Sequence, residues 1–197
     1  MRPLQTFAAA ALALAASAAL AQTSRAELVF DIENDTLLPG QSTTVTLAAG
    51  WDGPWYLMCC VATDLLISTG DAGWSDLALI QPMAGPGTSP GALIATGVEG
   101  ILAGQLNFPP GGPWEPQPNP LPFWRATYTA PADVATPFNV DLTTDTSLFE
   151  VYISRDSAET RSLMDVLTEG NATIRVIPAP ASTLVLLGLV VAQRRRR

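Results

Sequence analysis

The chain has 197 residues and a formal net charge of −8, with 18 acidic residues against 10 basic ones. It contains no His, and every basic residue is Arg. Five Arg lie in the terminal segments, so the remainder holds five basic residues against 18 acidic ones, or about −13. Such a surface repels phosphate and excludes a nucleic-acid-binding role. Without His and Lys the chain also lacks a Ser-His-Asp or Cys-His apparatus and a Schiff-base lysine.

The first 21 residues predict a secretory signal peptide. Arg2 precedes an almost unbroken Ala/Leu run over residues 7–20, which suits a signal peptide and is short for a membrane span. Two cleavage sites fit: Ala19-Leu20-Ala21, which gives a mature start at Gln22, and Ser24-Arg25-Ala26, which gives a start at Glu27. The alternative is an N-terminal anchor that is not cut.

Residues 27–175 predict one all-β domain. Short apolar or alternating segments recur between turns rich in Gly, Pro and Asp, such as the turn at Pro39-Gly40. The predicted strands are residues 28–33, 42–47, 55–62, 77–80, 101–108, 123–129, 138–142, 149–153 and 172–177. About nine short strands favour a single β-sandwich.

Three segments depart from the strand pattern. Residues 81–91 and 109–122 are rich in Pro and Gly, so we expect loops without a ladder interior. Residues 157–169 are the one helical candidate, because the spacing of Leu163, Val166 and Leu167 is compatible with one helix face. This segment is short, and a loop is the alternative.

Aromatic residues surround the second Pro-rich segment. Trp114 lies within it, and Phe123 and Trp124 follow it. Exposed aromatics on such a loop would indicate a carbohydrate- or protein-binding module. The alternative is that they attach the loop to the core, because aromatic side chains bury a large apolar area.

The domain also resembles cohesin-like β-sandwich modules. The first hairpin of those domains is similar to residues 29–47 of this chain. This stretch consists of a strand with Val29-Phe30-Asp31, a turn at Pro39-Gly40 and a Thr-rich strand that ends at Leu47. The segment Trp74-Ser75-Asp76-Leu77 and a last strand that runs into the C-terminal tail fit the same resemblance. It implies a cohesin- or Ig-like sandwich and does not identify a partner.

Carboxylates remain as candidate site residues. A pair of them could hydrolyse glycosides, and the candidates are Asp64, Asp71, Asp76 and Glu99. No spacing distinguishes a pair, so we expect no catalytic residue and no enzyme.

Calcium binding is a second hypothesis for the acidic residues, because hard oxygen ligands on turns suit Ca²⁺. The groups are Asp31, Glu33 and Asp35; Asp64, Asp71 and Asp76; and Asp141 and Asp145. No EF-hand pattern is present, and the alternative is a solvated acidic rim. We therefore expect no cofactor, with Ca²⁺ as the open candidate.

Cys59 and Cys60 are adjacent. On a strand they would face opposite sides, one buried and one exposed, and neighbouring Cα atoms ~3.8 Å apart do not favour a disulfide. An intermolecular bridge is the alternative in an oxidising compartment. Two Cys without His supply too few ligands for a structural zinc site, so we expect no metal.

The last 22 residues combine three features. Pro178 and Pro180 impose extended backbone, residues 181–192 are uncharged and would be helical in lipid, and a basic cluster ends the chain. That cluster is Arg194, Arg195, Arg196 and Arg197. It would stop translocation and hold the end on the cytoplasmic side. The apolar run of about 12 residues is short for a stable transmembrane helix.

Residues 176–197 resemble the PEP-CTERM sorting signal. The matching motif is Pro178, Ala179, Pro180, Ala181 and Ser182, followed by the apolar run and the Arg cluster. The usual centre of that motif is Glu, where this chain has Ala179. The resemblance implies export, transient inner-membrane anchoring and processing by an exosortase. The alternative is a C-terminal anchor that is not processed.

Together these features predict an exported, non-enzymatic structural or interaction protein of the cell envelope or extracellular matrix. Its expected partners are the secretion machinery and an exosortase, and then exopolysaccharide or envelope proteins. The alternatives are a carbohydrate- or protein-binding module and a carboxylate-based glycoside hydrolase.

Overall fold

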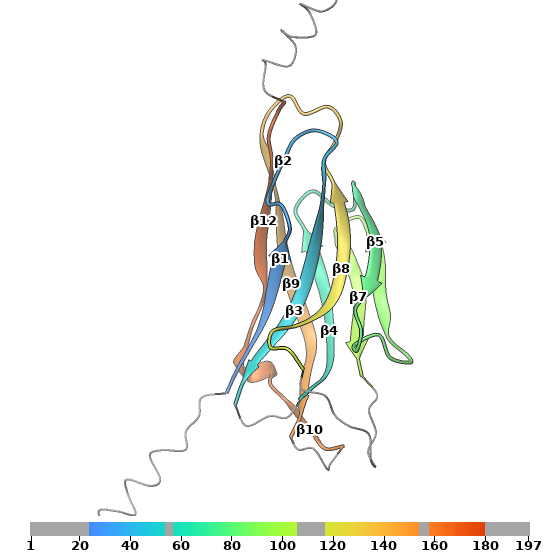
Figure 1. Cartoon of the computed structure of the whole chain (residues 1–197), viewed down its shortest axis with the longest axis vertical. Coiled ribbons are helices and arrows are strands. Elements are labelled where there is room, and N and C mark those ends of the chain that lie inside the picture. Colours follow the sequence, from blue (N-terminus) through green and yellow to red (C-terminus); the bar gives the residue numbers. More distant parts are fainter. Residues whose placement is uncertain (1–23, 54–56, 106–116, 154–157, 180–197) are drawn as a thin grey trace, which may run out of the picture.

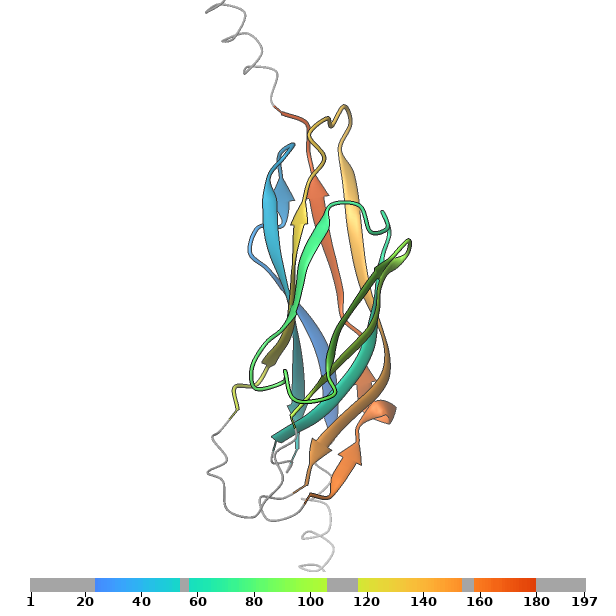
Figure 2. The same ribbon diagram turned by 90° about the vertical axis from the view of Figure 1, so that its right-hand side faces the viewer.

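The computed structural model describes residues 24–53, 57–105, 117–153 and 158–179. They form two β-sheets packed face to face in an elongated sandwich (Figures 1 and 2). The five-stranded sheet has the order β11 (Leu167–Thr168), β1 (Arg25–Ile32), β3 (Ser42–Asp52), β8 (Leu121–Thr129) and β5 (Trp74–Leu79). The seven-stranded sheet has the order β2 (Thr36–Leu37), β12 (Asn171–Val176), β9 (Phe138–Tyr152), β4 (Leu57–Ile67), β7 (Gly97–Gly104) and β6 (Ser89–Ile94), and β10 (Thr160–Ser162) pairs with β9. The predicted all-β sandwich is confirmed.

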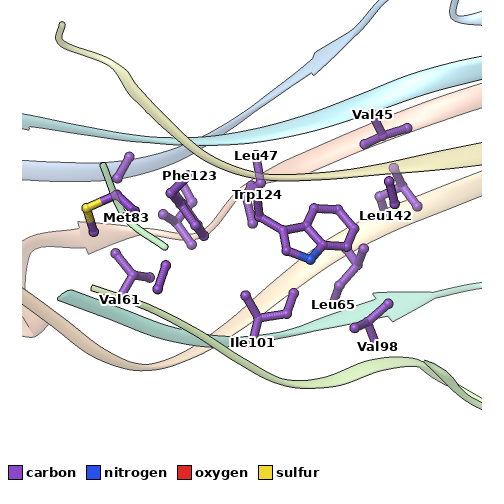
Figure 3. Packing of buried hydrophobic residues seen from close by; sticks show 14 of the residues in the cluster. Val45, Leu47, Val61, Leu65, Met83, Val98, Ile101, Phe123, Trp124 and Leu142 are labelled. Carbon is purple, nitrogen blue, oxygen red and sulfur yellow. The ribbon is translucent and has the colours of Figure 1, made fainter. Parts of the chain in front are cut away.

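The core lies between the two sheets (Figure 3). Alternate residues of the first part of β3 point into it, and Val45 and Leu47 are fully buried. Phe123 and Trp124 are also fully buried. The Trp124 indole points from β8 toward Leu65 of β4, and its Nε1 donates a hydrogen bond of 2.9 Å to the carbonyl of Pro90 on β6. Trp124 therefore connects the two sheets through packing and through a hydrogen bond.

The two ends of the described chain lie at opposite ends of the sandwich. In Figure 1 β1 begins at the lower end, whereas β12 leaves the domain at the upper end. Arg25 at the start of β1 pairs with Asp52, and Val176 at the end of β12 pairs with both Leu37 and Phe138. The C-terminal tail therefore follows the last strand at one end of the molecule.

The helix predicted over residues 157–169 is wrong within the described part of that range. β10 pairs there with β9, a 3-10 turn spans Met164–Val166, and β11 pairs with β1. Leu163 is buried and donates its backbone N–H to Phe149, whereas Val166 is 39% exposed. The three apolar residues do not share a buried face, because strand pairing fixes this segment.

Two other predictions change. The segments predicted at 138–142 and 149–153 belong to one strand, β9, because the Thr-rich residues between them stay paired with β4, with one register shift between Ala62 and Thr63. Residues 89–91, expected in a loop, begin β6. β6 lies at the edge of its sheet, where Pro90 can be accommodated because a ladder is needed on one side only.

Both terminal segments lie largely outside the described residues. The predicted signal helix and the predicted C-terminal membrane helix both lie outside the described residues. Within the described ranges, no helix combines the length and the apolar character needed to cross a bilayer.

Candidate functional site

A bulge in β4 places both cysteines on one side of the seven-stranded sheet. Met58 pairs with Val151, and the next paired residue, Cys60, is opposite Glu150, so Cys59 is the extra residue. Met58 and Val61 both belong to the core. The two residues between them therefore turn away from the core, and both are partly buried. The prediction of opposite faces, one buried and one exposed, is wrong, because a bulge breaks strand alternation.

Two glutamines hold the backbone next to this bulge. Gln105 donates from Nε2 to the carbonyl of Met58 at 2.7 Å, and Gln117 accepts from the N–H of Met58 at 2.9 Å. The N–H of Gln105 also donates to the carbonyl of Cys59 at 3.1 Å. These amides satisfy backbone groups at the bulge, where the ladder is interrupted, and so fix the positions of the cysteines.

Glu150 of β9 completes the cysteine cluster, which consists of Cys59, Cys60 and Glu150. One ligand atom from each of the three lies within 4.8 Å of the other two. Cys60 Sγ is 3.8 Å from Glu150 Oε2, and Thr160 Oγ1 donates to the same oxygen at 2.9 Å. The carboxylate is therefore oriented by β10.

The two thiols of the cluster differ in acidity. A hydrogen bond from Cys60 lowers the pKa of Cys59 to about 7, against 9.0 for an ordinary thiol, and a hydrogen bond from Tyr152 acts in the same direction. Donating that hydrogen bond raises the pKa of Cys60, as does its burial. Burial, with a smaller contribution from Cys59, raises the pKa of Tyr152. Cys59 is thus the group that deprotonates first.

A cavity of about 170 Å³ borders the cysteine cluster. Both cysteines line it together with Thr88, Leu102 and Gly104. The cavity therefore lies next to two of the three residues of the cysteine cluster. Sequence reasoning missed this cluster because Glu150 lies 90 residues beyond Cys60, and the only local signal was the adjacent cysteine pair.

The outer face of the seven-stranded sheet carries exposed apolar side chains. Leu66 of β4 and Ile94 of β6 both pair with Gly97 of β7, so the three residues form one row on the same side of the sheet. Leu66 is 46% exposed and Ile94 is 37% exposed. A Cβ at Gly97 would lie 1.9 Å from the carbonyl oxygen of Leu65. Glycine is therefore required between the two apolar residues, and we call this set the Leu66–Ile94 row.

Acidic residues lie beside the Leu66–Ile94 row. Asp64 pairs directly with Asp145 of β9, and Glu99 is exposed on β7. Asp64 Oδ1 accepts from the N–H of Gly100 at 2.7 Å, which fixes its position. Like charges that face each other across a strand pair are destabilising. The outer face thus combines exposed apolar side chains with acidic ones.

The carboxylates considered for hydrolysis are spread over the fold. Asp64 and Glu99 belong to the seven-stranded sheet, whereas Asp76 lies on β5 of the other sheet and Asp71 precedes it. Asp76 accepts from Ser75 Oγ at 3.0 Å. The four residues do not form one catalytic constellation.

Four of the residues considered for Ca²⁺ accept hydrogen bonds from hydroxyl or backbone N–H groups. Asp35 accepts from Thr36 Oγ1 at 3.2 Å and Asp141 from Thr173 Oγ1 at 2.8 Å. Across the part of the chain that the structure describes, Cys59, Cys60 and Glu150 are the one group of three such side chains close enough to share a metal.

The aromatic residues near the second Pro-rich segment do not form an exposed platform. Phe123 and Trp124 are core residues, so neither can contact a ligand, and the alternative of attachment to the core holds for both. Trp114 lies outside the described residues.

The predicted signals are described only in part. Pro178 and Ala179 follow β12 directly, and the N–H of Ile177 donates to the carbonyl of Leu37 at 2.9 Å. The remaining signal residues lie outside the described ranges: Ala19, Ala21, Pro180, Ala181, Ser182 and Arg194 to Arg197.

Comparison with solved structures identifies the fold. The chain is similar to the seventh ScaB type I cohesin from Pseudobacteroides cellulosolvens, with a TM-score of 0.53 and 15% identity over 79% of this chain and 92% of that chain. A cohesin module of a Clostridium perfringens family 33 glycoside hydrolase gives a TM-score of 0.45 and 11% identity, over 80% and 100% of the two chains. A type I cohesin–dockerin complex from Clostridium thermocellum gives 0.49 and 13%, over 78% and 99%.

No protein-family model matches the sequence, and no curated protein matches it. The structural similarity to the ScaB cohesin establishes the fold alone, because the identity is low. The described part of this chain is a cohesin-like β-sandwich.

Proposed function

We propose that this chain is an exported, non-enzymatic interaction module that binds a protein partner through the outer face of its seven-stranded sheet. The observation that carries the proposal is the Leu66–Ile94 row, in which two large apolar side chains stand exposed on either side of a buried Gly97. The two side chains lie on the same face as exposed acidic residues, and together these groups offer a partner an apolar contact with charges around it. The cohesin-like fold supports a binding role in general terms and does not specify the partner.

The charge of the same face defines the partner further. Asp64, Asp145 and Glu99 lie beside the row, so a complementary surface presents basic side chains around an apolar anchor. Electrostatic complementarity of this kind steers association and suppresses wrong partners. The partner is therefore expected to be a protein with a basic, partly apolar surface, and binding should weaken as salt concentration rises.

The binding proposal is tested by capture from envelope and medium fractions of the native host. The double variant Leu66→Glu/Ile94→Glu places two more charges in the row, and the protein captured by the wild type should be lost. Val166→Glu is the control, since Val166 is 39% exposed on a different segment, and it should retain that protein. Equal capture by all three proteins would refute the outer face as the binding surface.

We further propose that the two terminal segments direct the domain to the cell surface or extracellular matrix. In this proposal Ala19 and Ala21 specify signal cleavage, Arg194 to Arg197 stop translocation, and an exosortase cuts near Pro178 to Ser182. The fold supports this arrangement, because the last strand ends at Val176, two residues before the motif. The tail would thus be removed without any loss of a strand.

The motif is tested by replacing both of its prolines. Pro178→Ala/Pro180→Ala should leave the uncut chain in the inner membrane, because an enzyme that reads the motif no longer recognises it. Pro137→Ala, in the loop before β9, is the matched control and should be processed normally. Normal processing of the double variant would remove the exosortase part of the proposal and leave export and binding intact.

A further inference from the structure

The cysteine cluster has the chemistry of a metal-binding site. It joins two thiols from β4 with one carboxylate from β9, and these ligand atoms already lie within 4.8 Å of one another. Zn²⁺ accepts both thiolate and carboxylate ligands. A surface group of three carboxylates would not carry this argument, because acidic residues are common on surfaces without a metal.

The distances are close to those of a tetrahedral site. Bond lengths of ~2.3 Å to sulfur and ~2.1 Å to oxygen place tetrahedral ligands ~3.6 Å apart for a sulfur–oxygen pair and ~3.8 Å apart for two sulfurs. Cys60 Sγ and Glu150 Oε2 are 3.8 Å apart. The upper limit of 4.8 Å for the other pairs exceeds these values by about 1 Å. Any adjustment that these pairs need is therefore at most about 1 Å.

The surroundings orient the ligands as second-sphere groups of a metal site do. Thr160 Oγ1 donates to Glu150 Oε2 at 2.9 Å, and hydrogen bonds of this kind hold ligating carboxylates in place. Gln105 and Gln117 hold the backbone of Met58, next to the bulge. Bulges that re-aim side chains are common beside functional sites.

The adjoining cavity supplies the remaining coordination position. Its volume of about 170 Å³ accommodates several water molecules, and both cysteines line it. A metal held by three protein ligands can therefore bind a water or a small donor from the cavity side.

We propose that Cys59, Cys60 and Glu150 bind a thiophilic divalent cation of the Zn²⁺ class, with the fourth position open to the cavity. On binding, both S–H bonds break and the protons pass to solvent, while the hydrated cation exchanges bound waters for two metal–sulfur bonds and one metal–oxygen bond. The site is independent of the outer-face binding proposal, because no residue of the Leu66–Ile94 row takes part in it.

Cobalt provides a direct spectroscopic test. The full chain, purified under reducing conditions, is titrated with Co²⁺, and a thiolate-to-metal charge-transfer band should appear, saturate and disappear on addition of Zn²⁺. Cys59→Ser, Cys60→Ser and Glu150→Gln should each weaken binding at least about tenfold, because even second-sphere substitutions cost 10–100-fold. Glu33→Gln, which removes an exposed carboxylate just after β1, is the matched control and should bind as the wild type does.

Thermal unfolding with and without Zn²⁺ is a second measurement, which keeps the test valid if a variant folds poorly. Zn²⁺ should raise the thermal unfolding midpoint of the wild type and of Glu33→Gln, since a ligand that binds only the native state stabilises it, and should not raise that of Glu150→Gln. Absence of the charge-transfer band while both thiols react with a thiol reagent would overturn the proposal. An unchanged band in the Cys59→Ser/Cys60→Ser double variant would also overturn it, as would a Cys59–Cys60 disulfide that persists under those reducing conditions.

Discussion

Among single residues, Trp124 makes the contact that links the two sheets most directly. Its ring is fully buried, and its Nε1 bonds to Pro90 on the edge strand of the opposite sheet. The sequence left open whether Trp124 was exposed or buried, because a Pro-rich segment precedes it and aromatic residues occur in both settings. Its position on β8 decides the question, since Trp124, like Phe123, belongs to the core.

Replacement of Trp124 by Ala should destabilise the domain by about 3–5 kcal/mol, the range for deleting a large buried aromatic side chain. The loss combines apolar burial, a cavity and an unpaired carbonyl at Pro90. Urea denaturation followed by circular dichroism measures it. Val166→Ala, at an exposed site, should stay within about 0.5 kcal/mol of the wild type, and an equally small effect of Trp124→Ala would contradict the packing described.

Tyr128 should make the domain less stable at alkaline pH. Burial raises the pKa of Tyr128 above its ordinary value of 10.0, and its ring packs against Trp74 with a centroid distance of 5.2 Å. Above pH 10 the unfolded chain has lost this proton while the folded chain retains it, so the free energy of unfolding falls as pH rises. Below pH 10 the contribution is fully present.

Stability measured between neutral and alkaline pH tests this expectation. Tyr128→Phe should show a shallower decrease than the wild type, because one of the titrating groups has been removed. Identical slopes for the two proteins would show that Tyr128 titrates normally in the folded state.

Among the strands, β-bulges and edge positions explain most of the differences between the predicted and the observed structure. The run from Leu57 to Ile67 reads as a strand, yet the change of register at Cys59 leaves no local mark, because Met58 to Val61 are all apolar or small. The strand pattern was predictable from alternation and turn residues. The pairing that assembles Cys59, Cys60 and Glu150 was not, because it depends on contacts far apart in the sequence.

The predicted helix at residues 157–169 fails for a related reason. Its apolar spacing fits one helix face, but β10 and β11 pair with β9 and β1 instead. The hydrogen bonds of these pairings satisfy the backbone and override a short helical pattern. Isolated short helices are marginal, so tertiary pairing decides such segments.

The facing carboxylates of β4 and β9 give a prediction at this scale. Asp145→Asn should raise the free energy of unfolding by about 0.2–1 kcal/mol, because it removes a like charge directly opposite Asp64. The gain should shrink at high salt. Asp133→Asn, in the exposed loop before β9, changes the net charge equally and should have a smaller effect; an equal gain would point to overall charge and not to the pair.

The whole molecule is arranged so that its two terminal segments leave from opposite ends. β1 begins at one end, and β12 delivers the tail at the other (Figure 2). The cysteine cluster lies near the start of β4, close to the pairing of Leu57 with Tyr152 and of Tyr152 with Thr160, which is the end opposite the tail.

The patterns of the two terminal segments led to the proposed export and sorting of this chain. The alternation of apolar and polar residues predicted its fold class. The binding face could not be derived from sequence, because the Leu66–Ile94 row depends on the register of three strands. A shift of one residue in β7 would remove Gly97 from between Leu66 and Ile94 and bring a residue with a side chain into the row.

Export and sorting are tested most directly by the intact mass of the protein in membrane and medium fractions of its native host. The account predicts a mature chain that starts near Gln22 and ends near Pro178 in the medium or outer envelope, with both terminal segments removed. A chain that keeps residues 184–197 in every fraction would contradict sorting by the tail, and a chain that also keeps its first 21 residues and remains in the cytoplasm would contradict export.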